Sequence, residues 1–418
     1  MNTHAPYRDD GPAGYLVVLG SGPQAEWEYA MRRLAAVGPL LLIDAEPPTW
    51  QQPLLAEART ARLTDPSRVL STVQKFASTR PLAGALTFHP AQARTVDLLR
   101  RELALPAPPT ATIEVTVLRH RTAQLLTTAG VDNSGPIHAD TYDQALEAAH
   151  QVGFPLVCKP ASPRVRYAAR QVRGLPELAE AFSAATAATW HGTGTVIEPL
   201  LDGIEATAYT ADSPTGPRVV AISHATFDPQ AERALVPVEV VVDADDVCAP
   251  AVEDTASRAL AALGHRSGPA QIRMRITSTG PRVISVATHL TDPLLGMLIQ
   301  QVTGIDLISQ AGHHARGRAL HADESRLGAA AVRFLQGPES AALLPPSAAT
   351  HPHITPYATL RPYPAEHPVG PLQRSGHVLV SGTDYPQCTA RLRSAAAEIR
   401  SARLSAVTEI YTRHMERG

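Results

Sequence analysis

The segment Gly153-Phe154-Pro155-Leu156-Val157-Cys158-Lys159-Pro160 joins an apolar run of strand length to a lysine at its end. Lysines and arginines together number 37, and only two of them are lysines, so an ammonium at this position stands out. Lysine is a compact point charge that suits phosphate oxygens, whereas arginine is a broad fork that stays protonated. Lys159 is therefore the first candidate for an anion-binding residue. The alternative is a strand-end lysine that extends into water.

The bulk composition narrows the class of protein around this segment. A chain of 418 residues is long enough for two to four domains. Its net charge of −2 provides no basic surface for nucleic acid or an anionic membrane. The three cysteines are too few and too far apart for a disulfide framework or a zinc site. With no export signal and no apolar run near ~18 residues, we expect a cytoplasmic protein without a membrane segment.

Before this segment, the sequence indicates an α/β domain. Apolar runs at Tyr15–Leu19 and Leu40–Ile43 enclose a glycine turn and a helical pattern from Trp27 to Leu34, which is typical of a βαβ unit. The turn lacks the full G-x-G-x-x-G spacing, so we do not predict a dinucleotide site there. A proline-rich stretch then places the end of this domain near residue 110.

The rest of the chain divides into three further regions. Residues 111–200 are predicted to form linker helices and a small lid that contains the Lys159 strand. Residues 201–330 form an α+β core with a mostly antiparallel sheet, because short apolar or alternating runs recur along it. Residues 331–418 form an α+β extension that ends in a strand and a helix. The predicted fold class is thus α/β and α+β.

These elements, in this order, resemble the ATP-grasp superfamily, and more narrowly its amino-acid ligase and carboxylate–amine ligase branch. The resemblance covers nearly the whole chain and is carried by the ordered segments LLTTAGV, GFPLVCKP, VIEPLLDGIEATAY, GPRVI, TGIDL, AAVRFL and SGHVLVSG. It implies a Rossmann-like N-terminal domain, a small lid domain and a larger core, with ATP between lid and core. It also implies that a carboxylate is converted to an acyl phosphate and passed to an amine.

The resemblance implies roles for five residues. Lys159 contacts the nucleotide phosphates from the strand end, and Arg119 does so from an earlier helix. Glu198 lies beside the backbone of Leu200, which pairs with adenine, and Glu205 holds the ribose hydroxyls. These residue types suit those tasks, because phosphate needs positive charge and hydroxyls need an acceptor. The alternative for Glu198 and Glu205 is a pair of solvated strand-end acids.

The magnesium ligands of the family are replaced in this sequence. The carboxylate on one strand and the Glu-x-Asn pair on the next fall at Arg273, Ser285 and Ala287. None of these side chains is a hard anionic ligand, and an arginine repels a divalent ion unless it takes over the ion's charge. The arginine that steadies the acyl phosphate becomes His289. Arg273 and His289 are therefore the predicted catalytic residues of a remodelled centre that has no metal ligand at the usual positions.

Two interpretations remain open. In the first, the protein is a ligase in which Arg273, Arg164 or Arg166 neutralises the phosphates, or in which Asp292, His289 and Glu198 rebuild a weaker metal site. In the second, it is an inactive pseudo-ligase that binds a nucleotide, an acyl ligand or a protein partner.

The first interpretation makes ATP the cofactor, leaves magnesium undecided, and makes a small-molecule carboxylate and an amine the partners in a biosynthetic reaction. The motifs identify neither the acyl donor nor the amine acceptor, because loops build such pockets. A homodimer is the commonest oligomer for a protein of this kind. The 17 histidines show no i, i+4 pair on a convincing helix, so no histidine metal site is predicted.

Overall fold

The computed structural model describes most of the chain from residue 14 to residue 397. The described residues are 14–106, 116–132, 135–162, 169–189, 192–227, 237–243, 245–246, 248–318, 320, 328–336, 353–355, 358–362 and 374–397. Among them, no helix combines the length and the apolar character that crossing a membrane requires. Arg164 and Arg166 lie outside the described residues, as does the end of the predicted last helix.

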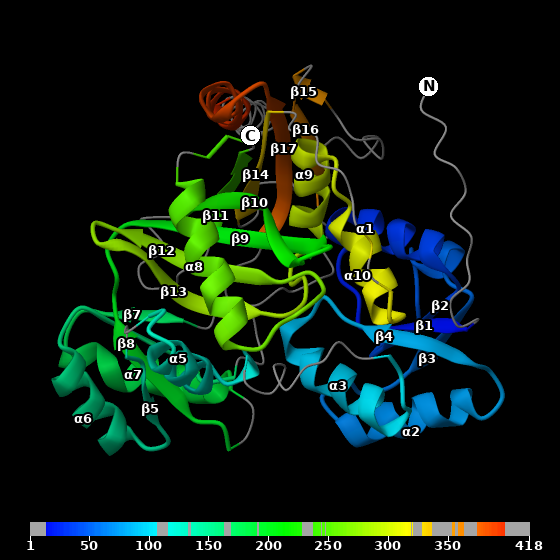
Figure 1. Cartoon of the computed structure of the whole chain (residues 1–418), viewed down its shortest axis with the longest axis horizontal. Coiled ribbons are helices and arrows are strands. Elements are labelled where there is room, and N and C mark those ends of the chain that lie inside the picture. Colours follow the sequence, from blue (N-terminus) through cyan, green and yellow to red (C-terminus); the bar gives the residue numbers. More distant parts are fainter. Residues whose placement is uncertain are drawn as a thin grey trace, which may run out of the picture.

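The N-terminal unit is a four-stranded parallel sheet with helices on its faces (Figure 1). The strand order is β3-β2-β1-β4. The two central strands read as continuous apolar runs because both of their faces are buried. The elements are β1 (Tyr15–Leu19), α1 (Gln24–Val37), β2 (Leu40–Asp44), η1 (Gln52–Leu54), β3 (Glu57–Thr60), α2 (Pro66–Ala77), β4 (Leu82–Leu86), η2 (Pro90–Gln92) and α3 (Ala93–Glu102).

The lid is a second, antiparallel sheet of four strands in the order β5-β8-β6-β7. Two helices cover it, and the first begins with a capping box in which the Thr141 and Gln144 side chains each bond the other's backbone. Buried alanines let these helices lie close to the strands. The elements are α5 (Arg119–Thr128), β5 (Ile137–Ala139), α6 (Tyr142–Val152), β6 (Leu156–Pro160), β7 (Arg170–Val172), α7 (Leu175–Ala187) and β8 (Thr195–Pro199).

The core is a nine-stranded sheet in the order β13-β12-β9-β10-β11-β14-β17-β16-β15, antiparallel throughout. Its elements are β9 (Ile204–Ser213), β10 (Gly216–Phe227), β11 (Pro237–Asp243), α8 (Ala249–Ala262), β12 (Gln271–Thr277), β13 (Gly280–Ala287), α9 (Pro293–Thr303), α10 (Leu307–Ala315), β14 (Ala329–Gln336), β15 (His353–Thr355), β16 (Ala358–Pro362), β17 (Arg374–Gly382) and a helix over 385–397. The predicted boundary at residue 330 falls inside β14. That division is therefore wrong as a sheet boundary, because β14 to β17 extend the same sheet.

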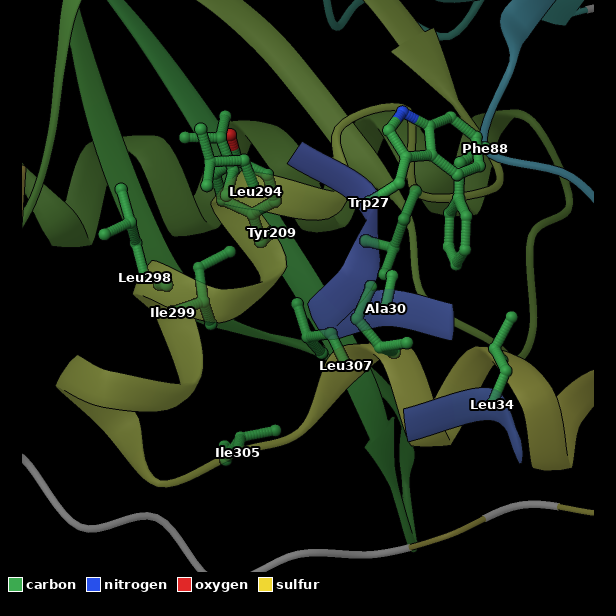
Figure 2. Packing of buried hydrophobic residues seen from close by; sticks show 14 of the residues in the cluster. Trp27, Ala30, Leu34, Phe88, Tyr209, Leu294, Leu298, Ile299, Ile305 and Leu307 are labelled. Atoms are coloured by element: carbon green, nitrogen blue, oxygen red, sulfur yellow. The ribbon is translucent and has the colours of Figure 1, made fainter. Parts of the chain in front are cut away.

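An apolar cluster joins the N-terminal unit to the core (Figure 2). Helix α1, which carries Trp27 and Leu34, packs against α9 and α10, which carry Leu298, Ile299 and Leu307, and all five side chains are at most 3% exposed. Each large apolar side chain buried in this way stabilises the fold by about 1.5–3 kcal/mol. The cluster therefore holds the N-terminal sheet firmly beside the part of the core that carries α9 and α10.

Candidate functional site

A cavity of about 360 Å³ lies between the lid sheet and the core sheet. Strands β6 and β8 line it from the lid, and β9, β12 and β13 line it from the core. Nine positions singled out from the sequence all line this cavity, namely Arg119, Lys159, Glu198, Leu200, Glu205, Arg273, Ser285, Ala287 and His289. The fold thus gathers into one space residues that are spread over 171 positions of the chain.

On the lid side, Lys159 forms an ion pair with Glu198. In the ladder of β6 and β8, Glu198 is opposite Val157, two residues from Lys159, so both charged side chains are on the same face of the lid sheet. Their Nζ and Oε1 atoms are 2.5 Å apart, and the side chains are 4% and 18% exposed. The alternative of a lysine extending into water is therefore wrong. Burial lowers the pKa of Lys159 to about 8, although Glu198 opposes that shift.

Arg119 stands beside this pair. It is the first residue of α5, and its backbone N–H donates to the carbonyl of Ala161, just beyond the end of β6. Burial and then the nearby charge of Arg273 lower its pKa to about 10, while Glu198 opposes the shift. Its Nε is buried and has no hydrogen-bond partner among the described residues. Arg119 is thus a charged donor with unused hydrogen-bonding capacity.

The backbone of Leu200 differs from the expectation. Its N–H donates to the carbonyl of Pro155 at 3.2 Å, which extends the pairing of β6 with β8 by one bond. The prediction that this amide is free to pair with adenine is therefore wrong for this conformation. An adenine contact through it requires the Pro155 bond to break.

On the core side, Glu205 is held between two arginines. Its carboxylate oxygens lie 2.9 Å from Nε of Arg273 and 3.2 Å from an Nη of Arg275, and its side chain is 5% exposed. β9 pairs with β12 so that Glu205 is directly opposite Arg275, while Arg273 is two residues along the same face. The alternative of a solvated acid is therefore wrong. The prediction that Glu205 is free for ribose also needs correction, because both oxygens already have cationic partners.

The positions of the expected magnesium ligands come together without forming a metal site. Arg273 is opposite Ser285 and Gln271 is opposite Ala287 in the β12–β13 ladder, so the three positions are neighbours in space. The cation of Arg273 occupies the place of a carboxylate and is already paired with Glu205. Among the described residues, no three acidic, histidine or cysteine side chains form a group that could hold a metal ion, so Glu198, His289 and Asp292 do not rebuild one.

His289 differs in charge from the arginine whose position it takes. Burial, followed by the positive charge of Arg100, lowers its pKa to about 4. The imidazole is therefore neutral at pH 7, and His289 remains a predicted catalytic residue that acts through hydrogen bonds rather than charge. Its Nε2 is buried and has no hydrogen-bond partner among the described residues.

Two lining residues were missed by the sequence analysis. Arg275 could have been found from the two-residue period of a strand, because it shares the face of Arg273. Asp132 follows α5, and it accepts hydrogen bonds from the Arg282 side chain at 3.1 and 3.2 Å and from the Val283 amide. It ties the start of the lid to β13. No local pattern marks it, because its partners lie 150 residues away.

As a whole, the cavity brings cations and carboxylates together in equal number. The cations are Arg119, Lys159, Arg273 and Arg275, and the carboxylates are Asp132, Glu198, Glu205 and Asp292. Asp132 is bound to Arg282, and Asp292 caps α9, so these two acids are engaged outside the group of four cations. The four cations suit a ligand with several negative charges, because each added anionic oxygen can replace part of an existing ion pair.

Comparisons with known proteins bear mainly on the fold. No family model matches the sequence. The uncharacterized protein y4rH of Sinorhizobium fredii is 27% identical over 286 residues, which are 67% of this chain and 59% of that protein. The chain thus spans about three fifths of the length of this relative.

Solved structures match over nearly the whole chain. An L-amino acid ligase from Bacillus licheniformis superposes with a TM-score of 0.74 at 17% identity, covering 93% of this chain and 98% of that one. A biotin carboxylase from Campylobacter jejuni, solved with β-γ-ATP, has a TM-score of 0.72 at 15% identity and covers 93% and 91% of the two chains. An N5-carboxyaminoimidazole synthetase from Staphylococcus aureus, solved with ADP, has a TM-score of 0.71 at 15% identity and covers 93% and 98%.

Proposed function

We propose, from the ATP-grasp fold that this chain shares with those ligases, that the protein binds ATP between its lid and core sheets and uses it to join a carboxylate to an amine. The observation that carries the proposal is that Arg119, Lys159 and Arg273 lie in one cavity with the carboxylates of Glu198 and Glu205. Arg119 and Lys159 interact with Glu198 and Arg273 pairs with Glu205, so the three cations provide the charge that a polyphosphate needs.

The chemistry requires two bond exchanges. An oxygen of the substrate carboxylate attacks the γ-phosphorus of ATP, the bond to ADP breaks, and an acyl phosphate forms. The amine nitrogen then attacks the acyl carbon, inorganic phosphate leaves, and the nitrogen loses a proton. Positioning and charge stabilisation account for most of the catalysis of phosphoryl transfer, so fixed cations are the main contribution that the protein makes.

In this proposal the residues of the cavity divide the work. Lys159 and Arg119 hold phosphate oxygens, and Glu198 lies at the adenine. Glu205 keeps Arg273 in place and accepts from ribose hydroxyls with its remaining lone pairs. His289 contributes a neutral hydrogen-bonding group beside the reacting atoms.

Magnesium does not fit the residues at its usual positions. Arg273 presents a cation there, and the opposite positions carry a serine and an alanine. We therefore assign the neutralisation of the transferring phosphate to Arg273 and derive no step through a metal.

The replacement of the usual metal ligands supports a second candidate function. Losing every usual metal ligand removes several kcal/mol of transition-state stabilisation, and each ~1.4 kcal/mol is tenfold in rate. A pseudo-ligase that binds nucleotide without turnover would retain Lys159 and Arg119 and lose the metal ligands.

Calorimetric titration of ATP, with excess magnesium and separately with EDTA, tests the proposal. We expect binding that is the same in both conditions within about threefold, because the protein supplies the charge. Release of ADP is then measured with panels of carboxylates and amines. Turnover supports the ligase, binding without turnover over a broad panel favours the pseudo-ligase, and no binding in either condition contradicts a nucleotide site.

A further inference from the structure

A second, smaller cavity of about 40 Å³ lies next to the first, where the N-terminal sheet meets the core. The end of β4, helices α3 and α10, and the segment after β13 line it. Most of its walls are apolar, with Phe88 and Val96 among them, but Arg100, Thr288, His289 and His314 also face it. His289 lines both cavities, so the two spaces are neighbours across one side chain.

Arg100 is a buried cation that forms no ion pair with a carboxylate among the described residues. It is 9% exposed, and an Nη donates to the carbonyl of Ala85 at 3.0 Å. The acidic side chain that acts on it is Asp97, which lies 3.4 Å from Arg101 in an ion pair of its own. Burial lowers the pKa of Arg100 to about 10, so the group remains charged at pH 7. Its Nε is buried and has no hydrogen-bond partner among the described residues.

Two further groups at this cavity have unused hydrogen-bonding capacity. Nε2 of His289 and Oγ1 of Thr288 are buried, and neither has a hydrogen-bond partner among the described residues. The Arg100 charge also reaches His289 and His314, because it lowers the pKa of both rings. The acid nearest His314 is Asp212, 3.8 Å from its Nδ1, and Asp212 also accepts from the Gly268 amide. The lining of the cavity is thus positive and supplied with donors.

Such an arrangement is unfavourable unless something compensates for it. A buried charge without a counter-ion and buried polar atoms without partners each destabilise a fold, and natural proteins rarely retain several together. A carboxylate group has two acceptor oxygens, fits a cavity of this size and would satisfy Arg100 and Thr288 at once. Ordered water would satisfy the hydrogen bonds but leave the charge of Arg100 without a counter-ion.

We propose that this cavity binds a carboxylate group, with Arg100 as its counter-ion and Thr288 and His289 as hydrogen-bonding partners. Given the proposed ligase function, this carboxylate is a second, non-reacting anionic group of the substrate. The substrate then extends past His289, with its reacting end among the cations of the larger cavity. The substrate class is accordingly a small molecule with two anionic groups, or an amino acid held by its α-carboxylate.

The test uses acetate as the probe and the full chain without nucleotide. Binding is followed through the midpoint of thermal unfolding and by calorimetry, with sodium chloride and inorganic phosphate at matched ionic strength. We expect acetate to stabilise the wild type and Arg101→Met, an exposed arginine on the same helix. Arg100→Met should bind acetate at least about tenfold more weakly.

Stability without acetate provides a second readout. Because Arg100→Met removes an unpaired buried charge, we expect the variant to be at least as stable as the wild type in acetate-free buffer. If Arg100→Met does not fold, Thr288→Val replaces it, with an expected weakening of about threefold to tenfold. Equal acetate binding by the wild type and these variants would overturn the proposal. Equal effects of chloride or phosphate, or no response of the wild type to acetate, would do the same.

The outcome can be separated from that of the ligase proposal. If the wild type fails to bind ATP but responds to acetate through Arg100, the ligase function fails and the carboxylate site stands. If ATP binds but acetate does not, the carboxylate site fails and the nucleotide site stands.

Discussion

The two walls of the larger cavity differ in how their cations pair with carboxylates. On the lid wall one lysine meets one carboxylate, Glu198, and a second cation, Arg119, stands beside them. On the core wall one carboxylate, Glu205, is shared by Arg273 and Arg275. In the family that the sequence resembles, the core wall is the side that supplies acidic metal ligands.

Under the proposed function, this difference means that the protein itself supplies the positive charge at the core wall. A carboxylate wall needs a metal ion before it can face phosphates, whereas an arginine wall presents its charge permanently. The lid wall needs no replacement of its side chains, because its lysine can bind phosphate oxygens whether or not a metal ion is present. We therefore expect the lid wall to determine affinity for the nucleotide and the core wall to determine stability and independence from magnesium.

Removing the lid cation should have the largest effect. We expect Lys159→Met to weaken ATP binding by at least about a hundredfold, because a charge-assisted contact with phosphate is lost from a buried position. The only other lysine, Lys75, is exposed at the end of α2, and Lys75→Met should leave the affinity unchanged. Calorimetric titration of both variants measures the contrast. Similar affinities for both variants would mean that the phosphates do not bind at the lid wall.

Removing the core carboxylate should mainly affect stability. We expect Glu205→Gln to lower the free energy of unfolding by about 2 kcal/mol, because two arginines lose their shared counter-ion. We set this value below that of a fully buried pair, because the Arg273 side chain is 34% exposed.

Glu57→Gln, which breaks an exposed pair with Arg59, provides the matched control, with an expected change below about 0.5 kcal/mol. Urea denaturation compares the two variants. Equal losses would mean that Glu205 is no more important to the fold than a surface acid.

The smallest expected effect is a pH dependence confined to the lid wall. Phosphate binds the protonated form of Lys159, so affinity is full below its pKa and declines as the pH rises through about 8. We expect ATP to bind about tenfold more weakly at pH 9 than at pH 7. Lys159→Arg keeps its charge over this range and should show a flat profile. A decline of the same size in that variant would assign the titration to another group.

Much of the fold was predictable because its strands are locally marked. The strands at Tyr15–Leu19 and Leu40–Asp44 follow from short apolar runs, and the structure has each within one residue of the predicted bounds. The predicted ATP-grasp fold is confirmed by the solved structures, which match over nearly the whole chain. The Lys159 strand begins at Leu156, three residues after the segment that marked it begins, since strand ends are the least marked part of such a pattern.

Other elements were not predicted. Helices α2, α8, α9 and α10 lie in stretches that were left uninterpreted or were interpreted through strands alone. In α9, for instance, eight of the eleven residues are buried, so only a narrow polar stripe is left to reveal its period. The short strands β5 and β7 are the edge strands of the lid sheet and pair with β8 and β6. Their extended form depends on this pairing, which the local sequence does not reveal.

By itself, the sequence determined which residue types meet at this cavity. The sequence alone shows a lysine at a strand end and an arginine at the start of a helix. Through the family resemblance, it also shows that Arg273, Ser285 and Ala287 replace the metal ligands. They are local features, because a residue's place at the end of a strand depends on its immediate neighbours.

Only the tertiary structure decided which charges satisfy one another. The pairing of β9 with β12 places Glu205 against two arginines about 70 residues away. Its carboxylate is therefore a counter-ion for these arginines and is not reserved for ribose. Packing of the N-terminal unit on the core buries His289 and brings Arg100 near it, and both effects lower its pKa and keep that imidazole neutral. Charge and burial at a site depend on neighbours from distant segments, and folding rather than sequence order selects those neighbours.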